Sequence, residues 1–371
     1  MPDTDSRKPE LILVLNPGST STKLAVFEDD RCLCEGVVRH SALELGRFER
    51  IWDQYEYRKA AVLEFLGDRG ISLRSLTAVV GRGGPFRPTV SGTYRVNPEM
   101  ISDARNEVQG THVSNLGAVL AYGIAWDYGL ASFIVDPPCV DELEPVARYS
   151  GLPEIPRTSI VHALNVKATA RAAAAELGKG VCDANLVVAH LGGGVSVCAL
   201  RRGRMVDVSN GLSGGPFTPE RAGTLPTVDL VKLCFSGAHT EAEIIRKLVG
   251  GGGLTAHLGT SDVAEALRRA DGGDAKAKAV LDAMVYQIAK EIGAMAVVLG
   301  GQLDAVVLTG GIAKSRAIAD RIAERVGFLG RVIVMPGEDE LRALALGCLR
   351  VLKGEEDAKV YPETVDDKYC R

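Results

Sequence analysis

The chain has 371 residues, of which 46% are hydrophobic and 24% are charged, and its formal net charge is −4. This length exceeds one ordinary hydrophobic core, so we expect two domains. The slightly acidic balance gives no basic field for nucleic acid, and no segment approaches the ~20 apolar residues that cross a bilayer. Residues 1–10 are polar and lack a signal-peptide core, which predicts a cytoplasmic protein without membrane or nucleic-acid partners.

Apolar periodicity and Gly or Pro breaks predict strands and helices that alternate along the chain. The predicted strands cover 11–16, 23–28, 32–39, 77–82, 132–136, 185–191, 195–200, 204–209, 304–309 and 331–335. The predicted helices cover 47–67, 97–108, 113–128, 159–177, 227–235, 240–249, 261–270, 275–299, 315–326 and 338–352. This mixture is typical of the α/β class. The eight cysteines form no CxxC pair, so we expect small buried thiols, with Cys370 exposed near the terminus.

A sparse repeat relates the two halves of the chain. A shift of 175 residues places Gly18–Ser21 over Gly193–Ser196. In each half an apolar strand precedes this Gly/Ser-rich turn (LILVLN and NLVVAHL), and two more strands follow it. The repeat therefore predicts two related domains that each begin with a three-stranded meander and face each other across a cleft.

Both turns suit the binding of phosphate. Glycines let backbone N–H groups approach a ligand closely, and hydroxyl groups add donors. Two such turns in one cleft could hold a nucleotide triphosphate from both sides. For each turn taken alone, a simple tight β-turn remains the alternative.

A third segment, DAVVLTGGIAKS at 304–315, carries two glycines where a buried strand meets a helix. Such a junction suits an adenosine or its α-phosphate, because the N–H groups at the start of a helix attract anions. An ordinary strand-to-helix loop is the alternative. The chain contains no GxxxxGK[ST] segment, so it is not a P-loop enzyme.

Two phosphate turns and a strand–Gly-Gly–helix junction resemble the sugar kinase, Hsp70 and actin superfamily. Within it, five ordered segments resemble the acetokinase family, closest to its butyrate kinase branch: LVLNPGSTSTKLAVFE, VVGRGG, VVAHLGGGVSV, LTGGIAKS and MPGEDELRALALG. The resemblance runs from about residue 11 to 355. It implies two similar α/β domains with an interdomain nucleotide cleft. Residues 9–150, joined by the C-terminal helix within 338–371, would bind carboxylate and phosphate, and residues 151–337 would bind the nucleotide.

The same resemblance implies reversible, magnesium-assisted transfer of phosphate between ATP and a short-chain carboxylate. The closest match is butyrate plus ATP giving butyryl phosphate plus ADP. Kinases of acetate, propionate or branched acids stay open as alternatives. So do a sugar kinase, which would need an aspartate base on an alcohol, and a nucleotide-gated binding module. The family resemblance also implies a homodimer or a higher homo-oligomer.

The proposed chemistry requires no general base. A carboxylate has a reference pKa of about 4 to 5 and is ionised at pH 7. The site must instead suppress repulsion between that carboxylate and the phosphoryl group, and phosphoryl transfer depends mostly on positioning and electrostatics. We therefore expect arginines, histidines and a metal ion.

The resemblance assigns catalytic roles to four residues. Arg82 in VVGRGG and Arg221 in PFTPERAGT match its substrate and transition-state arginines, and His162 in IVHALN matches a histidine beside the transferred group. Asp136, after the strand SFIV, matches a catalytic aspartate that would position the water shell of magnesium. Structural ion pairs, a core histidine and a loop-capping aspartate are the respective alternatives.

The nucleotide-binding residues follow from the same motifs. They are Ser19, Ser21, Lys23, His190, Gly192, Gly193, Gly194, Gly310, Gly311 and Ile312. For His190 a buried core histidine is the alternative, and His112 in GTHVSN resembles a further family histidine. Acetate kinases carry an asparagine where this chain has Gly193, so here a backbone N–H must replace that donor.

Magnesium ligands are expected at both ends of the chain. Asn16, at the end of the first strand, matches a family asparagine that contacts magnesium. The partner carboxylate lies in PGEDEL, where position matching favours Asp339 and the adjacent Glu340 is the alternative. Magnesium needs few protein oxygens because it keeps several waters. Alternatively, the acidic pair only stabilises the N-terminus of the 338–352 helix.

Overall fold

The computed structural model describes residues 8–362, and the chain divides into two compact units. Among the described residues, unit 1 holds 8–141 and 339–362, and unit 2 holds 142–338. The sequence analysis predicts the boundaries between the two domains at 150/151 and 337/338. Its range 338–371 and its expectation for Cys370 extend into 363–371, which lie outside the described residues.

Unit 1 is built on a seven-stranded sheet in the order β12-β5-β6-β4-β1-β2-β3. Its strands are β1 (Leu11–Pro17), β2 (Ser21–Glu28), β3 (Arg31–Arg39), β4 (Ala78–Arg82), β5 (Thr93–Arg95), β6 (Ala131–Val135) and β12 (Lys359–Val360). The first three form an antiparallel meander, while β4 lies parallel to both β1 and β6. The carboxyl ends of β1, β4 and β6 therefore meet at one edge of the sheet.

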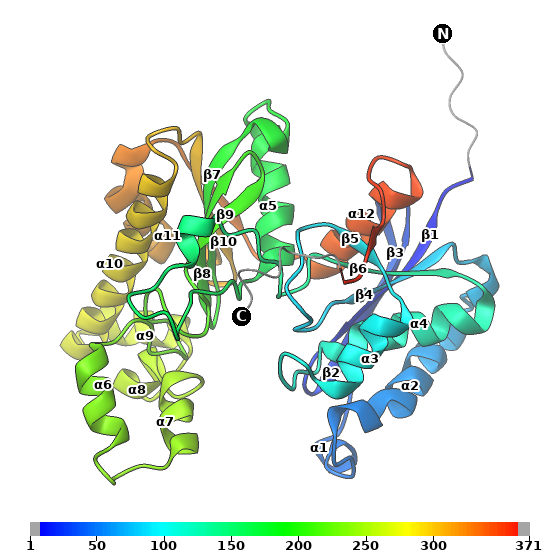
Figure 1. Cartoon of the computed structure of the whole chain (residues 1–371), viewed down its shortest axis with the longest axis horizontal. Helices are drawn as coiled ribbons and strands as arrows, with labels where there is room; N and C mark the ends of the chain where they lie inside the picture. The colour runs from blue at the N-terminus through cyan, green and yellow to red at the C-terminus, as the bar shows by residue number, and fades with distance from the viewer. Residues whose placement is uncertain (1–7, 363–371) are drawn as a thin grey trace. The chain divides into compact units, whose positions relative to one another are not determined.

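Helices cover both faces of this sheet (Figure 1). The α-helices of unit 1 are α1 (Ala42–Leu45), α2 (Tyr55–Asp68), α3 (Pro98–Asn106), α4 (Asn115–Tyr128) and α12 (Glu340–Leu352). Leu13 and Leu15 of β1 share a core with α2 and α4. Helix α12 also packs on β1, β4 and β6, and since strand side chains alternate between faces, it covers the side to which Ile12 and Val14 point.

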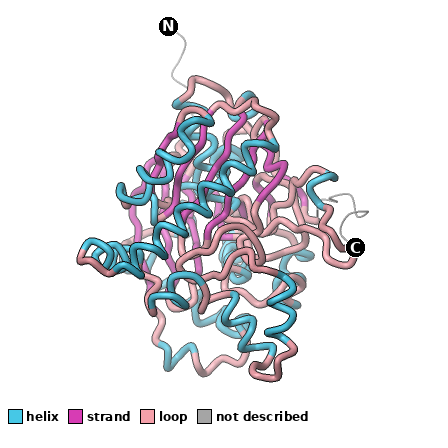
Figure 2. Tube along the Cα trace, turned by 90° about the vertical axis from the view of Figure 1, so that its left-hand side faces the viewer, coloured by secondary structure: helices cyan, strands magenta, loops and turns pink. Residues whose placement is uncertain are grey.

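Unit 2 is built on a five-stranded sheet in the order β11-β10-β7-β8-β9. Its strands are β7 (Asn185–Leu191), β8 (Val195–Arg201), β9 (Arg204–Val208), β10 (Ala305–Gly310) and β11 (Val332–Pro336). Strands β7, β8 and β9 form an antiparallel meander, and β10 runs parallel to β7 and β11. The strands (magenta) run side by side behind crossing helices (cyan) in Figure 2.

The helices of unit 2 lie on both sides of its sheet (Figure 1). They are α5 (Ala163–Glu176), α6 (Thr227–Cys234), α7 (Glu241–Leu248), α8 (Gly253–Leu258), α9 (Val263–Asp271), α10 (Ala275–Val298) and α11 (Arg316–Val326). Helices α10 and α11 share a large apolar core with β7, β8 and β10, and α5 packs against β7 and β10. Short 3-10 helices occur at Ile51–Gln54, Leu73–Ser75, Pro145–Arg148, Val181–Asp183, Ile312–Lys314 and Gly327–Leu329.

The two sheets confirm the repeat. The order β3-β2-β1-β4 in unit 1 matches β9-β8-β7-β10 in unit 2, with an antiparallel meander followed by a parallel strand in each case. The α/β class is confirmed as well. The central strands are apolar on both faces, as expected for strands that helices cover on both sides.

Three features differ from the prediction. The helix expected over 47–67 begins only at Tyr55, because the Asp53 carboxylate accepts from the Arg50 N–H and starts a 3-10 turn at Ile51–Gln54. The short elements α1, β5, β12 and α8 were not predicted. Cys198 and Cys348 are buried, but Cys32, Cys182 and Cys234 are exposed free thiols. Within residues 8–362, no helix has both the length and the apolar character that a membrane span requires.

Candidate functional site

The first phosphate-type turn joins β1 to β2 in unit 1. The Gly18 N–H donates to the Ser21 carbonyl over 2.7 Å and closes the turn. Ser19 and Thr20 are exposed at its apex, and Ser21 is half-buried. Lys23 is exposed and lies opposite Asn16 in the β1–β2 register. The predicted residues Ser19, Ser21 and Lys23 therefore all lie on this turn or the start of β2.

Asn16, Arg82 and Glu340 meet at the edge where β1 and β4 end. The Arg82 guanidinium forms an ion pair with Glu340, and the Asn16 amide donates to Glu340 Oε2 over 2.6 Å. Only 12% of the Arg82 side chain is exposed. Burial acts to raise the pKa of Glu340, but Arg82, Asn16 and Lys23 outweigh burial and lower it. Glu340 is thus an ionised carboxylate held beside a cation and an amide.

The two acidic residues at the start of α12, Asp339 and Glu340, make different contacts. Asp339 caps α12, since its Oδ1 accepts from the Arg342 N–H over 3.0 Å, whereas Glu340 reaches Asn16. An amide oxygen and a carboxylate are suitable ligands for Mg²⁺, which keeps several waters. Residues 8–362 hold no cluster of three or more His, Cys, Asp or Glu side chains suited to a metal. The residue types of Asn16 and Glu340 suit magnesium, but in this structure the Asn16 amide nitrogen and the Arg82 guanidinium contact the two Glu340 oxygens.

Asp136 lies directly after β6, whose last residue Val135 pairs with Arg82 of β4. Its side chain is only 2% exposed. Asp136 Oδ1 accepts from Ser91 Oγ over 2.6 Å and from the Gly92 N–H over 2.8 Å. This carboxylate therefore orders the 91–92 loop, as the loop-capping alternative expects.

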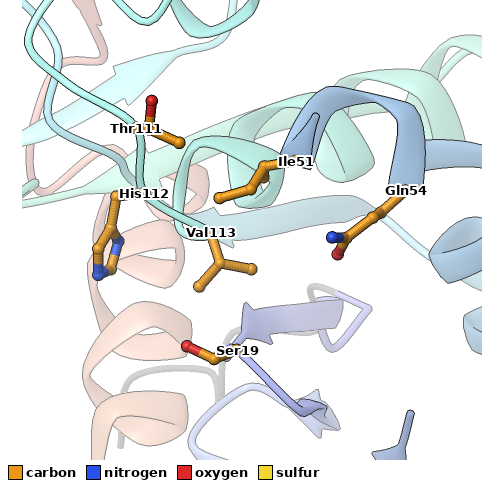
Figure 3. A pocket seen from close by; sticks show the side chains of 6 residues that line it. All are labelled: Ser19, Ile51, Gln54, Thr111, His112 and Val113. Atoms are coloured by element: carbon orange, nitrogen blue, oxygen red, sulfur yellow. The ribbon is translucent and has the colours of Figure 1, made fainter. Parts of the chain in front are cut away.

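Unit 1 also contains a cavity of about 220 Å³ next to the first turn (Figure 3). Its lining residues are Ser19, Ile51, Gln54, Thr111, His112 and Val113. His112 Nδ1 lies 2.7 Å from Ser114 Oγ, and burial together with the nearby Arg82 charge lowers the pKa of His112. The cavity thus combines apolar Ile51 and Val113 with a neutral imidazole beside a phosphate-type turn.

In unit 2, His162 and His190 form a stacked pair. Their ring centroids are 3.9 Å apart and their planes differ by 14°. His162 Nδ1 lies 2.9 Å from Ser196 Oγ, and His190 Nδ1 lies 2.8 Å from Asn165 Oδ1. With the Asn165 oxygen facing the ring, His190 Nδ1 is the nitrogen that donates in this contact.

The other ring nitrogen of His190 faces an acidic side chain and the glycine loop. His190 Nε2 lies 3.4 Å from Glu338 Oε1. A Cβ added to Gly192 would lie 3.1 Å from the same nitrogen. His190 Nε2 thus lies directly behind the loop Gly192–Gly194.

Arg221 lies beneath the same loop. A Cβ at Gly194 would overlap the Arg221 guanidinium, so only glycine leaves room for it. Arg221 donates to the Gly211 carbonyl, and Thr218 Oγ1 donates to the Gly193 carbonyl over 2.6 Å. Burial lowers the pKa of Arg221 and Glu220 counteracts it. The second phosphate-type turn is therefore backed by a guanidinium and an imidazole.

At the junction after β10, Gly310 is tightly packed and Gly311 has open space around it. Gly310 has φ +91° and packs against the Leu191 backbone, and it exchanges two hydrogen bonds with Gly337, of 3.2 and 2.9 Å. A Cβ on Gly311 would meet nothing within 4 Å. The Ile312 side chain is part of the unit 2 core, so a ligand could reach only its backbone.

Several residues at these sites were missed by the sequence prediction. One is Arg58 of α2, which donates to the Gly18 carbonyl in the first turn over 3.0 Å. The others are Ile51, Gln54, Asn165, Ser196, Thr218 and Glu338. For Arg58 a signal existed: with Val62, Phe65 and Leu66 it follows the i, i+4, i+7, i+8 spacing of a buried helix face. The others depend on tertiary contacts that no local pattern specifies.

The chain is similar in sequence and in fold to known proteins. A model of the acetokinase family matches residues 157–343, just over half of the chain. The acetate kinase of Porphyromonas gingivalis is 21% identical, with a TM-score of 0.74 over 90% of this chain and 98% of that one. The propionate kinase of Francisella tularensis subsp. tularensis SCHU S4 is 20% identical, with a TM-score of 0.72 over 91% and 98%.

The acetate kinase of Entamoeba histolytica is 18% identical, with a TM-score of 0.75 over 92% of this chain and 99% of that one. Likeness at these identities establishes the fold. The chain therefore has the fold of these kinases, and its two similar α/β units confirm the predicted fold class.

Proposed function

This chain belongs to the acetokinase family, and on that basis we propose that it transfers the γ-phosphoryl group of ATP reversibly to the carboxylate of a short-chain fatty acid, preferentially butyrate. The observation that carries the proposal is the loop Gly192–Gly194, which lies over both the Arg221 guanidinium and His190 Nε2. Donors and positive charge gathered behind a glycine turn are what a phosphoryl group requires.

The acceptor carboxylate is already ionised at pH 7, so the proposal needs no general base. In unit 2, Arg221 and His162 would donate to the phosphoryl oxygens as their charge redistributes. His190 would donate through Nε2 in its imidazolium form, because Nδ1 faces Asn165. In unit 1, Arg82 would receive the acceptor carboxylate. The ion pair with Glu340 engages one nitrogen of Arg82, and the planar guanidinium offers other donors.

The nucleotide roles are divided between the units. Gly192–Gly194, Gly310, Gly311 and the Ile312 backbone of unit 2 would hold ATP or ADP, and the turn with Ser19, Ser21 and Lys23 would hold the transferred phosphoryl group. Asn16 and Glu340 would hold Mg²⁺, which when bound neutralises phosphate charge. Asp136 would position the magnesium water shell while its carboxylate keeps the 91–92 loop in place.

The acyl chain would lie in the cavity beside the first turn. Ile51 and Val113 give it an apolar wall, and Ser19 and His112 give it a polar end near Arg82. An apolar wall favours a four-carbon acid over acetate because each buried methylene contributes about 0.8 kcal/mol. The closer match of VVGRGG and Gly193 to the butyrate branch supports the same choice.

A hydroxylamine-trapping assay tests this function, because acyl phosphates react to give coloured hydroxamates. The purified protein is incubated with ATP, Mg²⁺ and acetate, propionate, butyrate, isobutyrate, valerate or hexanoate, and in parallel with a panel of sugars while ADP release is measured. We expect hydroxamate from the short-chain acids and no sugar-dependent ADP. Sugar-dependent ADP without hydroxamate would indicate a sugar kinase, and slow ATP hydrolysis independent of any acceptor would indicate a binding module.

A further inference from the structure

Helix α2 places a buried arginine directly behind the first phosphate-type turn. Arg58 is 0% exposed. Its Nη1 donates to the carbonyls of Gly18 (3.0 Å) and Ser21 (3.2 Å), and its Nη2 donates to the Ser19 carbonyl (3.2 Å). Nη1 also donates to Thr22 Oγ1 over 3.1 Å, and Nε donates to Gln54 Oε1 over 3.0 Å.

No carboxylate neutralises this guanidinium. Among the residues that the structure describes, Arg58 forms no ion pair, and all five of its hydrogen bonds go to carbonyl, hydroxyl or amide oxygens. Burial lowers the pKa of Arg58 to about 10, so it remains a cation at pH 7. A fully buried cation without a counter-ion is costly, and arginine is rarely buried in that state.

The bonds to Arg58 decide which way the turn faces. Three carbonyls, of Gly18, Ser19 and Ser21, are directed at the guanidinium. Over residues 8–362, the N–H groups of Ser19 and Thr20 have no hydrogen-bond partner, and both residues are exposed at the apex. A turn whose carbonyls point inward and whose N–H groups point outward is an anion-binding concavity, and a cation behind it strengthens the attraction.

We infer that Arg58 is a positioning residue for the phosphoryl group: it fixes the Gly18–Thr22 turn with its N–H groups outward and leaves an uncompensated positive charge behind them. A bound phosphate would supply the counter-charge that the chain does not. The identity of the anion rests on the proposed function, in which this turn holds the γ-phosphoryl group and not the α- or β-phosphate. Arg58 therefore contributes to the discrimination of ATP from ADP.

The experiment compares the affinities for ATP and ADP, by isothermal titration calorimetry of the full chain, in the wild type, Arg58→Met and Arg58→Lys. Methionine keeps the apolar stem without charge, and lysine keeps the charge without the planar fork. We expect Arg58→Met to weaken ATP binding about tenfold or more and to change ADP binding less than about twofold. Arg58→Lys should restore part of the difference, because the charge remains.

A matched control separates this role from a loss of packing. Val62→Ala creates a cavity one turn further along the same buried face of α2, without touching the turn. It should leave the ATP-to-ADP affinity ratio at the wild-type value. A merely structural role for Arg58 would move this ratio no more than Val62→Ala does.

The outcomes are distinct. An unchanged affinity ratio in folded Arg58→Met, or an equal fall in Val62→Ala, overturns the inference. If Arg58→Met does not fold, Arg58→Lys decides: a reduced ratio supports the inference and an unchanged one overturns it. If the wild type forms no acyl phosphate but Arg58→Met still loses its ATP preference, the proposed carboxylate chemistry fails and the role of Arg58 stands.

Discussion

At the scale of single residues, Arg221 and Gly194 act as one unit, because the guanidinium occupies the space that any other side chain at 194 would take. If Arg221 stabilises the phosphoryl group during transfer, Arg221→Ala should lower kcat by roughly 10²–10³ and weaken ATP binding only slightly. Gly194→Ala should reproduce much of this loss by displacing the guanidinium. Steady-state kinetics and nucleotide titration measure both effects.

The control for this pair is Arg246→Ala on α7, which removes an exposed arginine of unit 2 and should leave kcat unchanged. A wild-type kcat in folded Arg221→Ala would remove Arg221 from the site. Normal activity in Gly194→Ala would show that the loop accommodates a methyl group without moving the guanidinium.

His40 gives a prediction for stability against pH. This residue is 5% exposed, and burial together with Arg58 lowers the pKa of His40 to about 4. The unfolded chain protonates His40 near pH 6.5 and the folded chain only near 4, so the unfolded state binds more protons between these values. The free energy of unfolding should therefore fall by up to about 3 kcal/mol from this group alone as pH drops from 6.5 to 4.

The measurement is guanidinium unfolding followed by tryptophan fluorescence, which reports on unit 1 because Trp52 and Trp126 are the only tryptophans. The difference between wild type and His40→Gln should be steady above pH 6.5 and should shift in favour of the variant below it. Parallel pH dependence of the two proteins would show that His40 titrates normally in the fold.

At the scale of elements, the junction after β10 holds one tightly packed glycine, Gly310, and one with open space around it, Gly311. Gly310→Ala places a Cβ against the Leu191 backbone at a positive φ, so the free energy of unfolding should fall by about 2 kcal/mol or more. Gly311→Ala meets open space and should change stability by less than about 0.5 kcal/mol. If adenosine binds here, Gly311→Ala should still raise the KM for ATP several-fold, and an unchanged KM would place the nucleotide elsewhere.

The start of α12 offers a test of the magnesium ligands. Glu340→Gln weakens the oxygen donor that lies beside Asn16, so the Mg²⁺ concentration for half-maximal activity should rise about tenfold. Asp339→Asn is the matched control: asparagine caps helices as well as aspartate, so stability and magnesium dependence should stay close to wild type. A larger magnesium effect from Asp339→Asn than from Glu340→Gln would reverse the assignment.

Sequence patterns predicted the long elements and missed the short ones. Strands such as β7 and β10 are continuous apolar runs, and α10 has a clear helical period, so local patterns were sufficient. Strand β12 has two residues and exists only because it pairs with β5. Arg58 lies on the buried face of α2, but its partners are carbonyls about 40 residues away. A buried cation bonded to backbone oxygens leaves no sequence pattern at the acceptor positions.

At the scale of the whole molecule, the repeat was visible in the sequence because each unit begins with the same meander, and the two sheets confirm it. The juxtaposition of Asn16 with Glu340, 324 residues apart, had no basis in local pattern and came from the family resemblance. Position matching favours Asp339 as the magnesium ligand, and the proposal of Glu340 instead rests on the observation that Asp339 caps α12. The binding of ATP between the two domains and the homo-oligomeric state stay predictions.

The acyl preference belongs to this scale as well. Two further methylenes of butyrate relative to acetate contribute about 1.6 kcal/mol in an apolar pocket, which is about fifteenfold in kcat/KM if the transition state realises all of it. Propionate should lie between the two, and branched four- or five-carbon acids should be tolerated. A highest kcat/KM for acetate would make the substrate assignment wrong and leave the family and fold unchanged.

The central claim is that a carboxylate oxygen attacks the terminal phosphorus of ATP. The most direct measurement is ³¹P NMR of the reaction with ATP, Mg²⁺ and butyrate labelled with ¹⁸O in both carboxylate oxygens. Direct attack predicts a butyryl phosphate resonance with the upfield shift of an ¹⁸O bridge to phosphorus, together with ADP. The absence of butyryl phosphate, with only ADP and unlabelled inorganic phosphate formed, would contradict the account.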